Sequence, residues 1–279
     1  MQEPSLRNWR SPAICTTLAN LWHKHVLGLH VVSRQAGKPF NYLYTGFLLR
    51  VEAIHFWITA GHVVDAIARL DVRSARWVDG YGFGVADSIP VDFPSLPQFS
   101  LDREGIDVGI VELPENTADL LKANPQITFL DRRGWYRNDN ANPFGYYLVG
   151  VPDEHHHKAI VGPNHGMMYA DIKYPIATLP VERLDPETNN DELCASKEAL
   201  YGRVLEVEVP GLGNVRSICG MSGGPILSLE DASQGHFKYR LFAIQSAWRK
   251  ESRILRATPI EVLDVIFSPR EMRDANAGQ

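Results

Sequence analysis

Cys219-Gly-Met-Ser-Gly-Gly-Pro225 places one serine between glycines. Glycine has no Cβ and adopts backbone conformations that side chains obstruct, so Gly220 and the two glycines after Ser222 permit a tight turn. In such a turn the amides of Gly220 and Ser222 can converge on one point, where they would stabilise a negatively charged oxygen. The same composition is also typical of an ordinary turn, which is the alternative for this segment taken alone.

The segment also satisfies the G-x-S-x-G pattern of the α/β-hydrolase nucleophile elbow, in which an acid and then a histidine follow the serine. Only His236 follows Ser222, and the stretch between them is too short for the elements that would carry the acid. The residue order therefore argues against an α/β-hydrolase.

Two segments upstream supply what a reactive serine needs. A serine hydroxyl attacks a carbonyl only when a base takes its proton and a third group orients that base. His62, in Thr59-Ala-Gly-His-Val-Val64, follows a strand-like apolar run and precedes apolar positions at helical spacing. Asp107 lies near the start of the strand-like segment Gly105–Leu113, where a buried carboxylate needs a partner. The sequence predicts His62, Asp107 and Ser222 as catalytic residues; the alternative for Asp107 is an acid at a strand edge.

The order His, Asp, Ser and the three segments resemble those of trypsin/chymotrypsin-like serine peptidases, especially the bacterial HtrA type without an evident PDZ domain, over residues 26 to 268. The resemblance implies an all-β fold of two packed six-stranded antiparallel Greek-key β-barrels with short N-terminal and C-terminal helices. It also implies a serine endopeptidase that works through an acyl-enzyme, needs no cofactor, and binds the oxyanion with the amides of Gly220 and Ser222. Met221 replaces the aspartate that activates secreted members, so activation through that ion pair is not expected.

The resemblance divides the chain into three parts. They are an N-terminal helical extension, a first barrel with His62 and Asp107, and a second barrel with Ser222 and a C-terminal helix, at residues 1–25, 26–124 and 125–279.

Local patterns add detail to this division. Helices are expected at 11–25, at 114–124 between the barrels, and from Pro259 to Ile266. Residues 176–202, with a run of Pro, Asn and acidic residues, are expected to form an inserted surface loop.

The resemblance places the floor of the primary specificity pocket six residues before the nucleophile, at Arg216. A cationic floor would favour an acidic side chain before the cleaved bond. The alternative is an arginine on a solvated face.

Gln245, Ser246, Ala247 and Trp248 lie in a segment that resembles the family strand beside the substrate, where an extended polypeptide would add as a further strand. Ser246 aligns with the residue that hydrogen-bonds the catalytic aspartate; a plain core strand is the alternative. Trp248 stands where the family usually has a glycine, so its ring can narrow or close the site. A catalytically silent or conditionally activated protein-binding module is therefore the alternative function, and an esterase is a further one.

The composition argues against several other classes. The 279 residues are 44% hydrophobic and 22% charged, as in ordinary globular proteins, and the net charge of −5 gives no electrostatic footprint for nucleic acid. Three cysteines are too few for the disulfide framework of a secreted enzyme, and no apolar stretch is long enough to span a membrane. The expected compartment is the cytoplasm.

His155-His-His157 invites a metal interpretation. Consecutive residues of an extended chain point to opposite faces, so the three imidazoles are not expected to share one ion, and no metal is predicted. The expected partners are a polypeptide substrate and, for a regulated form, a regulatory protein, with no nucleic acid and no membrane.

Overall fold

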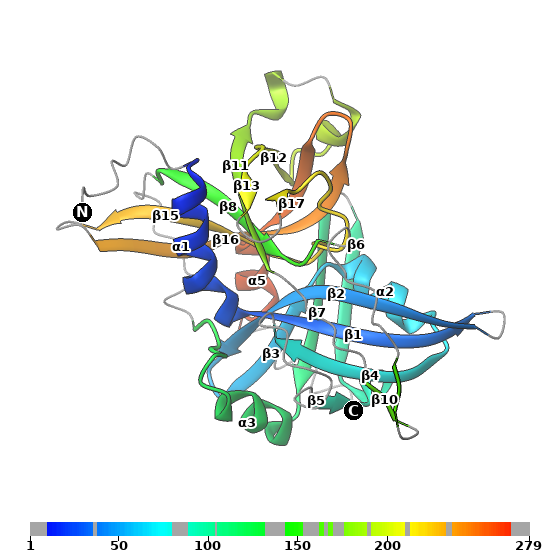
Figure 1. Cartoon of the computed structure of the whole chain (residues 1–279). Coiled ribbons are helices and arrows are strands. Elements are labelled where there is room, and N and C mark those ends of the chain that lie inside the picture. Colours follow the sequence, from blue (N-terminus) through cyan, green and yellow to red (C-terminus); the bar gives the residue numbers. More distant parts are fainter. Residues whose placement is uncertain are drawn as a thin grey trace.

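The computed structural model describes residues 10–35, 38–79, 89–103, 105–131, 143–152, 162–164, 167–169, 176–188, 191–209, 213–232 and 236–268. Most of them belong to antiparallel strands, which form two main sheets, one from each half of the chain (Figure 1). The predicted all-β fold class is confirmed.

The first sheet contains seven strands in the order β5-β4-β1-β2-β3-β7-β6, one more than the resemblance implies. Its end strands β5 and β6 do not pair with each other among the described residues, so the closed barrel predicted for this half is corrected to an open sheet. β1, β2 and β3 pair in succession and β4 returns beside β1, which is the Greek-key arrangement. The strands are β1 (Val26–Gln35), β2 (Lys38–Val51), β3 (Ile54–Thr59), β4 (Val72–Asp79), β5 (Ile89–Val91), β6 (Gln98–Arg103) and β7 (Ile106–Leu113).

The second sheet is a closed barrel of six antiparallel strands in the order β11-β12-β17-β16-β15-β8, as predicted. β8, β11 and β12 pair in succession and β15 returns beside β8, so the Greek-key arrangement is repeated. The barrel strands are β8 (Gly145–Gly150), β11 (Ala177–Leu184), β12 (Leu200–Val204), β15 (Pro225–Ala232), β16 (His236–Arg249) and β17 (Ile254–Pro259). Two small separate hairpins are β9 (Gly162–Asn164) with β10 (Met167–Tyr169), and β13 (Glu208–Val209) with β14 (Gly213–Asn214).

The helices in the described residues lie close to the predicted positions. α1 starts as its sequence indicates, since Ser11 Oγ accepts a hydrogen bond from the amide of Ile14 at 3.3 Å and proline fills the first helical position. In the described part of the chain, no helix is both long and apolar enough to span a bilayer. The helices are α1 (Pro12–Trp22), α2 (Gly61–Ala68), α3 (Glu115–Ala123) and α5 (Glu261–Ile266).

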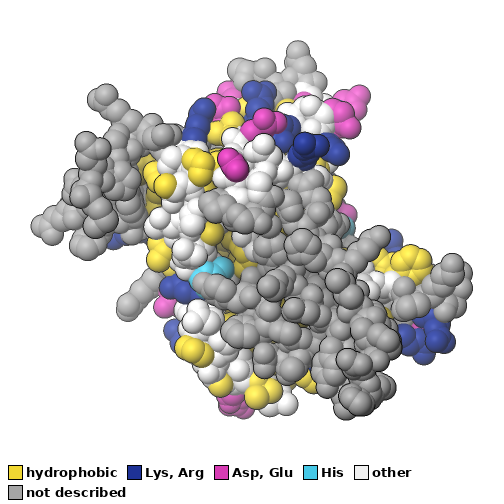
Figure 2. Space-filling view, in the orientation of Figure 1, with side chains coloured by type: hydrophobic (Ala, Val, Ile, Leu, Met, Phe, Trp, Pro, Cys, Tyr) yellow, Lys and Arg dark blue, Asp and Glu magenta, His cyan; other side chains and the backbone are white. Residues whose placement is uncertain are grey.

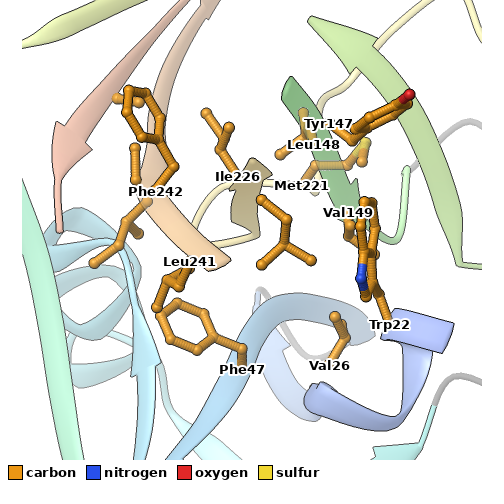
Figure 3. Packing of buried hydrophobic residues seen from close by; sticks show 14 of the residues in the cluster. Trp22, Val26, Phe47, Tyr147, Leu148, Val149, Met221, Ile226, Leu241 and Phe242 are labelled. Carbon is orange, nitrogen blue, oxygen red and sulfur yellow. The ribbon is translucent and has the colours of Figure 1, made fainter. Parts of the chain in front are cut away.

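One hydrophobic cluster joins the two sheets and α1 (Figure 3). Phe47 of β2 and Leu241 of β16 are both buried in it. α1 contributes Trp22, whose ring meets the edges of Tyr147 and Tyr239 at centroid distances of 5.4 and 5.6 Å. Burying such a ring stabilises the fold by on the order of 3 kcal/mol, so α1 is an integral part of the core.

The prediction of an inserted surface loop over residues 176–202 is wrong at both ends of that range. β11 and β12 occupy both ends of that range as barrel strands, which leaves only residues 185–199 as an insertion between them. Arg249 of β16 anchors this insertion through ion pairs with Asp191 and Glu192, at 3.0 and 3.2 Å.

Other predicted features fall partly or wholly outside the described residues. His155–His157, the candidate metal ligands, lie outside them. Cys15, Cys194 and Cys219 are free thiols.

The charged side chains are mixed in sign on the face that Figure 2 shows. Lys and Arg lie beside Asp and Glu near its upper end, so the described part of this face carries no continuous basic area.

Candidate active site

His62 lies at the strand-to-helix junction that the sequence predicts. β3 ends at Thr59 and α2 begins at Gly61, so His62 is in the first turn of the helix. A Cβ on Gly61 would come within 3.0 Å of the Val108 carbonyl oxygen, and closer still to that of Leu101. The missing side chain lets α2 sit directly on β6 and β7, where Asp107 is located.

Both carboxylate oxygens of Asp107 bind His62. The His62 amide donates to Oδ1 at 3.0 Å, and Nδ1 lies 2.7 Å from Oδ2. The side chain of Asp107 is buried, whereas 40% of the His62 side chain is exposed. Because a carboxylate only accepts hydrogen bonds, Nδ1 carries the proton and Nε2 is left as the basic nitrogen. The pair has the geometry of a base held by an orienting group.

The surroundings of His62 raise its pKa above the ordinary value. Burial alone lowers the pKa, but the hydrogen bond and the charge of Asp107 outweigh it, with help from the charge of Asp102. The positive charge of Arg256 opposes the rise. The net effect is an imidazole that accepts a proton more readily than a free histidine.

Ser222 lies in a turn whose glycines adopt left-handed backbone conformations. The φ angles are 85° at Gly220 and 86° at Gly223, a region that favours glycine. Between them Met221 is fully buried in the same core cluster as Leu148 and Val149 (Figure 3). The apolar side chain of Met221 therefore anchors the turn by packing. This is the position at which the sequence predicts no activating ion pair.

Both sheets hold this turn. From the barrel, Gln245 accepts a hydrogen bond from the amide of Gly223 at 2.8 Å and donates one to the carbonyl of Gly224 at 3.0 Å. From the first sheet, Thr45 Oγ1 donates to the carbonyl of Gly220 at 2.7 Å. The position of Ser222 thus depends on the packing of the two sheets against each other.

The backbone amides of the turn alternate in their use. Those of Cys219, Met221 and Gly223 donate to internal acceptors at 3.2, 3.0 and 2.8 Å. Those of Gly220 and Ser222 make no hydrogen bond within the described residues. The two unoccupied donors are the pair that the sequence predicts for the oxyanion.

A cavity of about 370 Å³ brings the predicted positions together, since His62, Gly220 and Ser222 all line it. Asp107 lies directly behind His62. Among the described residues no hydrogen bond joins Ser222 Oγ to His62, so proton transfer requires a side-chain rotation or the arrival of a substrate. The remaining lining residues come from β2 and α2: Asn41, Tyr42, Leu43, Tyr44, Val63 and Ala66.

The predicted hydrogen bond between Ser246 and Asp107 is not formed, because the Ser246 hydroxyl is bonded elsewhere. The Ser246 hydroxyl donates to the carbonyl of Arg256 at 3.1 Å and accepts from Arg256 Nε at 3.3 Å. Thr258 of β17 holds Asp107 instead: its Oγ1 accepts from the Asp107 amide at 2.7 Å and donates to the Asp107 carbonyl at 3.0 Å. The two residues are 151 positions apart, and no local sequence pattern connects them.

Gln245 is a positioning residue for the turn, and its expected contact with the substrate stays a prediction. Its backbone groups are taken by Gly223 and Gly224, and its buried side chain donates to the carbonyl of Ala247 at 3.1 Å. Ala247 and Trp248 follow Gln245 on β16. Pairing of β16 with β15 ends at Ile244, so among the described strands this stretch of β16 is paired only with β17.

Arg216 and Trp248 do not line the cavity of Ser222. Arg216 is exposed, and the Trp248 ring is partly buried with the Arg253 guanidinium 5.9 Å from its centroid. An acidic preference from Arg216 and a blocking role for Trp248 both stay predictions.

The described residues contain no cluster of metal ligands, and sequence comparisons find no matching family. Within the described ranges, no group of three or more His, Cys, Asp or Glu side chains could hold a metal ion. No protein-family model matches the chain, and no curated protein matches its sequence.

Solved structures of serine proteases resemble the chain at low identity. The protease Anisep from Arthrobacter nicotinovorans has 13% identity and a TM-score of 0.45, with 85% of this chain and 90% of that one covered. The active form of the Rv3671c protease from M. tuberculosis has 12% identity and a TM-score of 0.44, with 90% and 82% covered. The thermostable serine protease AL20 from an extremophilic microorganism has 11% identity and a TM-score of 0.43, with 85% and 92% covered. Likeness at this level does not assign an activity to the chain.

Proposed function

We propose that this protein is a serine endopeptidase that cleaves peptide bonds through an acyl-enzyme, with Ser222 as nucleophile, His62 as general base and acid, and Asp107 as the group that orients the imidazole. One observation carries the proposal: a histidine bound through Nδ1 to a buried carboxylate at 2.7 Å lines the same cavity as a glycine-flanked serine.

In the first half of the reaction, Ser222 Oγ attacks the carbonyl carbon while its proton passes to Nε2 of His62. The carbonyl oxygen becomes negative and binds the unoccupied amides of Gly220 and Ser222. Collapse of this intermediate breaks the C–N bond, and His62 gives the proton to the leaving amine. In the second half, water attacks the ester, His62 takes a proton from the water, and that proton returns to Ser222 as the acid product leaves.

The arrangement of the turn supplies the electrostatic part of catalysis. Two amides that have no hydrogen-bond partner within the described residues can bind the oxyanion without first breaking another bond. Removal of one such donor costs about 3 kcal/mol of transition-state stabilisation. The buried Asp107 stabilises the imidazolium that forms during each transfer.

Covalent labelling tests this proposal. A fluorophosphonate should label the folded wild-type protein at Ser222, identified by mass spectrometry of the labelled peptide. Ser222→Ala should abolish labelling, whereas Ser95→Ala, at an exposed serine between β5 and β6, should not change it. Cut sites in a peptide library should then appear with the wild type and vanish with Ser222→Ala.

The rival functions predict different outcomes of the same experiment. A correctly folded wild-type protein that never reacts with the fluorophosphonate would indicate the catalytically silent binding module. Labelling at Ser222 together with turnover of small esters, and no peptide cleavage under any condition, would indicate the esterase.

A further inference from the structure

We infer that the cavity beside Ser222 selects substrates with a bulky apolar or aromatic side chain within the first two residues after the cleaved bond. The inference rests on the proposed function and names a substrate class for it.

The position of the cavity relative to His62 assigns it to the leaving side of the substrate. His62 must reach the leaving nitrogen to protonate it, so the chain that follows that nitrogen runs past the imidazole. The cavity lined by Ser222 continues on this side, over α2 and β2, and has no lining residue from β16. The residues after the cleaved bond therefore enter it.

The chemistry of the lining indicates the side chain that would fit. Tyr42 and Tyr44 are half-buried on one face of β2, with their rings stacked at a centroid distance of 6.1 Å and an angle of 8°. Val63 and Ala66 of α2 add apolar surface, and His62 is the only titratable group besides the two tyrosines among the lining residues. A charged side chain would lose its hydration here without meeting a partner, whereas a leucine or phenylalanine would bury apolar area.

The competition of water and an added amine for the acyl-enzyme measures this preference separately from any preference for the residues before the cleaved bond. 4-Nitrophenyl acetate acylates Ser222 and releases nitrophenolate. An added amine then attacks the acetyl ester in competition with water, forming the acetyl amide and returning the proton to Ser222 through His62. The ratio of acetylated amine to acetate, measured by mass spectrometry with Ser222→Ala as blank, reports binding of the amine alone.

The amines are the amides of Leu, Phe, Gly, Asp and Lys and the dipeptide amides Gly-Leu, Gly-Phe and Gly-Asp. In one of the two series, the Leu and Phe members should exceed the Gly and Asp members by about tenfold or more. Tyr44→Ala and Tyr42→Ala should reduce this advantage about fivefold. Phe99→Ala, which removes an exposed ring on β6 outside the cavity, should leave the advantage unchanged.

A gain-of-preference variant keeps the test valid if the tyrosine variants do not fold. Ala66→Glu introduces a carboxylate into the lining and should make the Lys member the best amine. Acylation of Ser222 with equal ratios for all amines, or with Asp favoured, would overturn the inference and leave the proposed function intact. A protein that neither acylates nor labels at Ser222 would overturn both.

Discussion

Thr258 and Asp107 hold each other through two hydrogen bonds that cross from the barrel to the first sheet, 2.7 Å at the Asp107 amide and 3.0 Å at its carbonyl. Both residues are buried, so neither bond can be replaced by solvent. The carboxylate that orients His62 is therefore fixed by the second half of the chain. The geometry of the site depends on correct docking of the two sheets.

Thr258→Val keeps the shape of the side chain and removes the hydroxyl. The buried amide and carbonyl of Asp107 then lack partners, so the free energy of unfolding should fall by about 2 kcal/mol. The rate of fluorophosphonate labelling should also fall, and its acid limb should move, because Asp107 no longer holds His62 in place. Thr258→Ser should restore both. A loss of stability with an unchanged pH profile would show that Thr258 is merely structural.

The pH dependence of peptide cleavage should reflect the raised pKa of His62. His62 must be neutral to accept the serine proton, so kcat/KM should fall on the acid side with a midpoint above the ordinary histidine value of 6.5. Asp102→Asn removes a negative charge that contributes to the rise and should move the limb to lower pH. Asp107→Asn should lower kcat by roughly four orders of magnitude. A midpoint below 6.5 in the wild type would contradict the assignment of His62 as the base.

Gly223→Ala and Gly213→Ala form a matched pair, since both glycines have positive φ angles, 86° and 69°. A Cβ at Gly213 would meet nothing within 4 Å, so only backbone strain remains, about 1 kcal/mol. A Cβ at Gly223 would overlap the Thr59 hydroxyl and the carbonyl of Thr45. That variant should lose more than about 3 kcal/mol and its labelling at Ser222. Urea unfolding of the two variants compares the costs; equal values would disprove the close packing of the turn.

His25 should make the protein less stable as the pH falls. Burial lowers its pKa to about 4, against the opposing effect of a hydrogen bond to the Thr128 carbonyl at 2.8 Å. As the pH falls from 6.5 to 4, the imidazole of His25 becomes protonated in the unfolded state but stays neutral in the folded state. The free energy of unfolding therefore falls through this window, by on the order of 3 kcal/mol in total. Below about pH 4 the contribution of His25 is constant. Urea titrations across the window should show a shallower slope for His25→Gln, and the same slope in both proteins would contradict the assignment.

The sequence predicts the fold class and the pairing of His62 with Asp107 because both residues sit at the ends of regular elements with clear apolar patterns. The strand-to-helix junction at His62 and the start of β7 at Asp107 are local features. β11 was not predictable in the same way: Pro180, Glu182 and Arg183 interrupt its alternation, and its residues are buried only because neighbouring barrel strands cover them.

The parts of the site that the sequence misses are long-range. Thr258 reaches Asp107 only after the two sheets dock, and Ser246 turns instead to Arg256 on the adjacent strand. The cavity joins β2, α2 and the turn of Ser222, which lie far apart in the sequence. Local patterns therefore identify the reactive groups, whereas tertiary pairing decides what holds them and what they face.

The burial of Trp22 has a consequence for the life of the molecule in a cell. α1 precedes β8 and β16 in the chain, yet the rings that enclose Trp22 belong to those two strands. The apolar face of α1 is therefore translated before the strands that cover it. Loss of α1 would uncover the cluster that also buries Met221, and with it the support of the turn that carries Ser222.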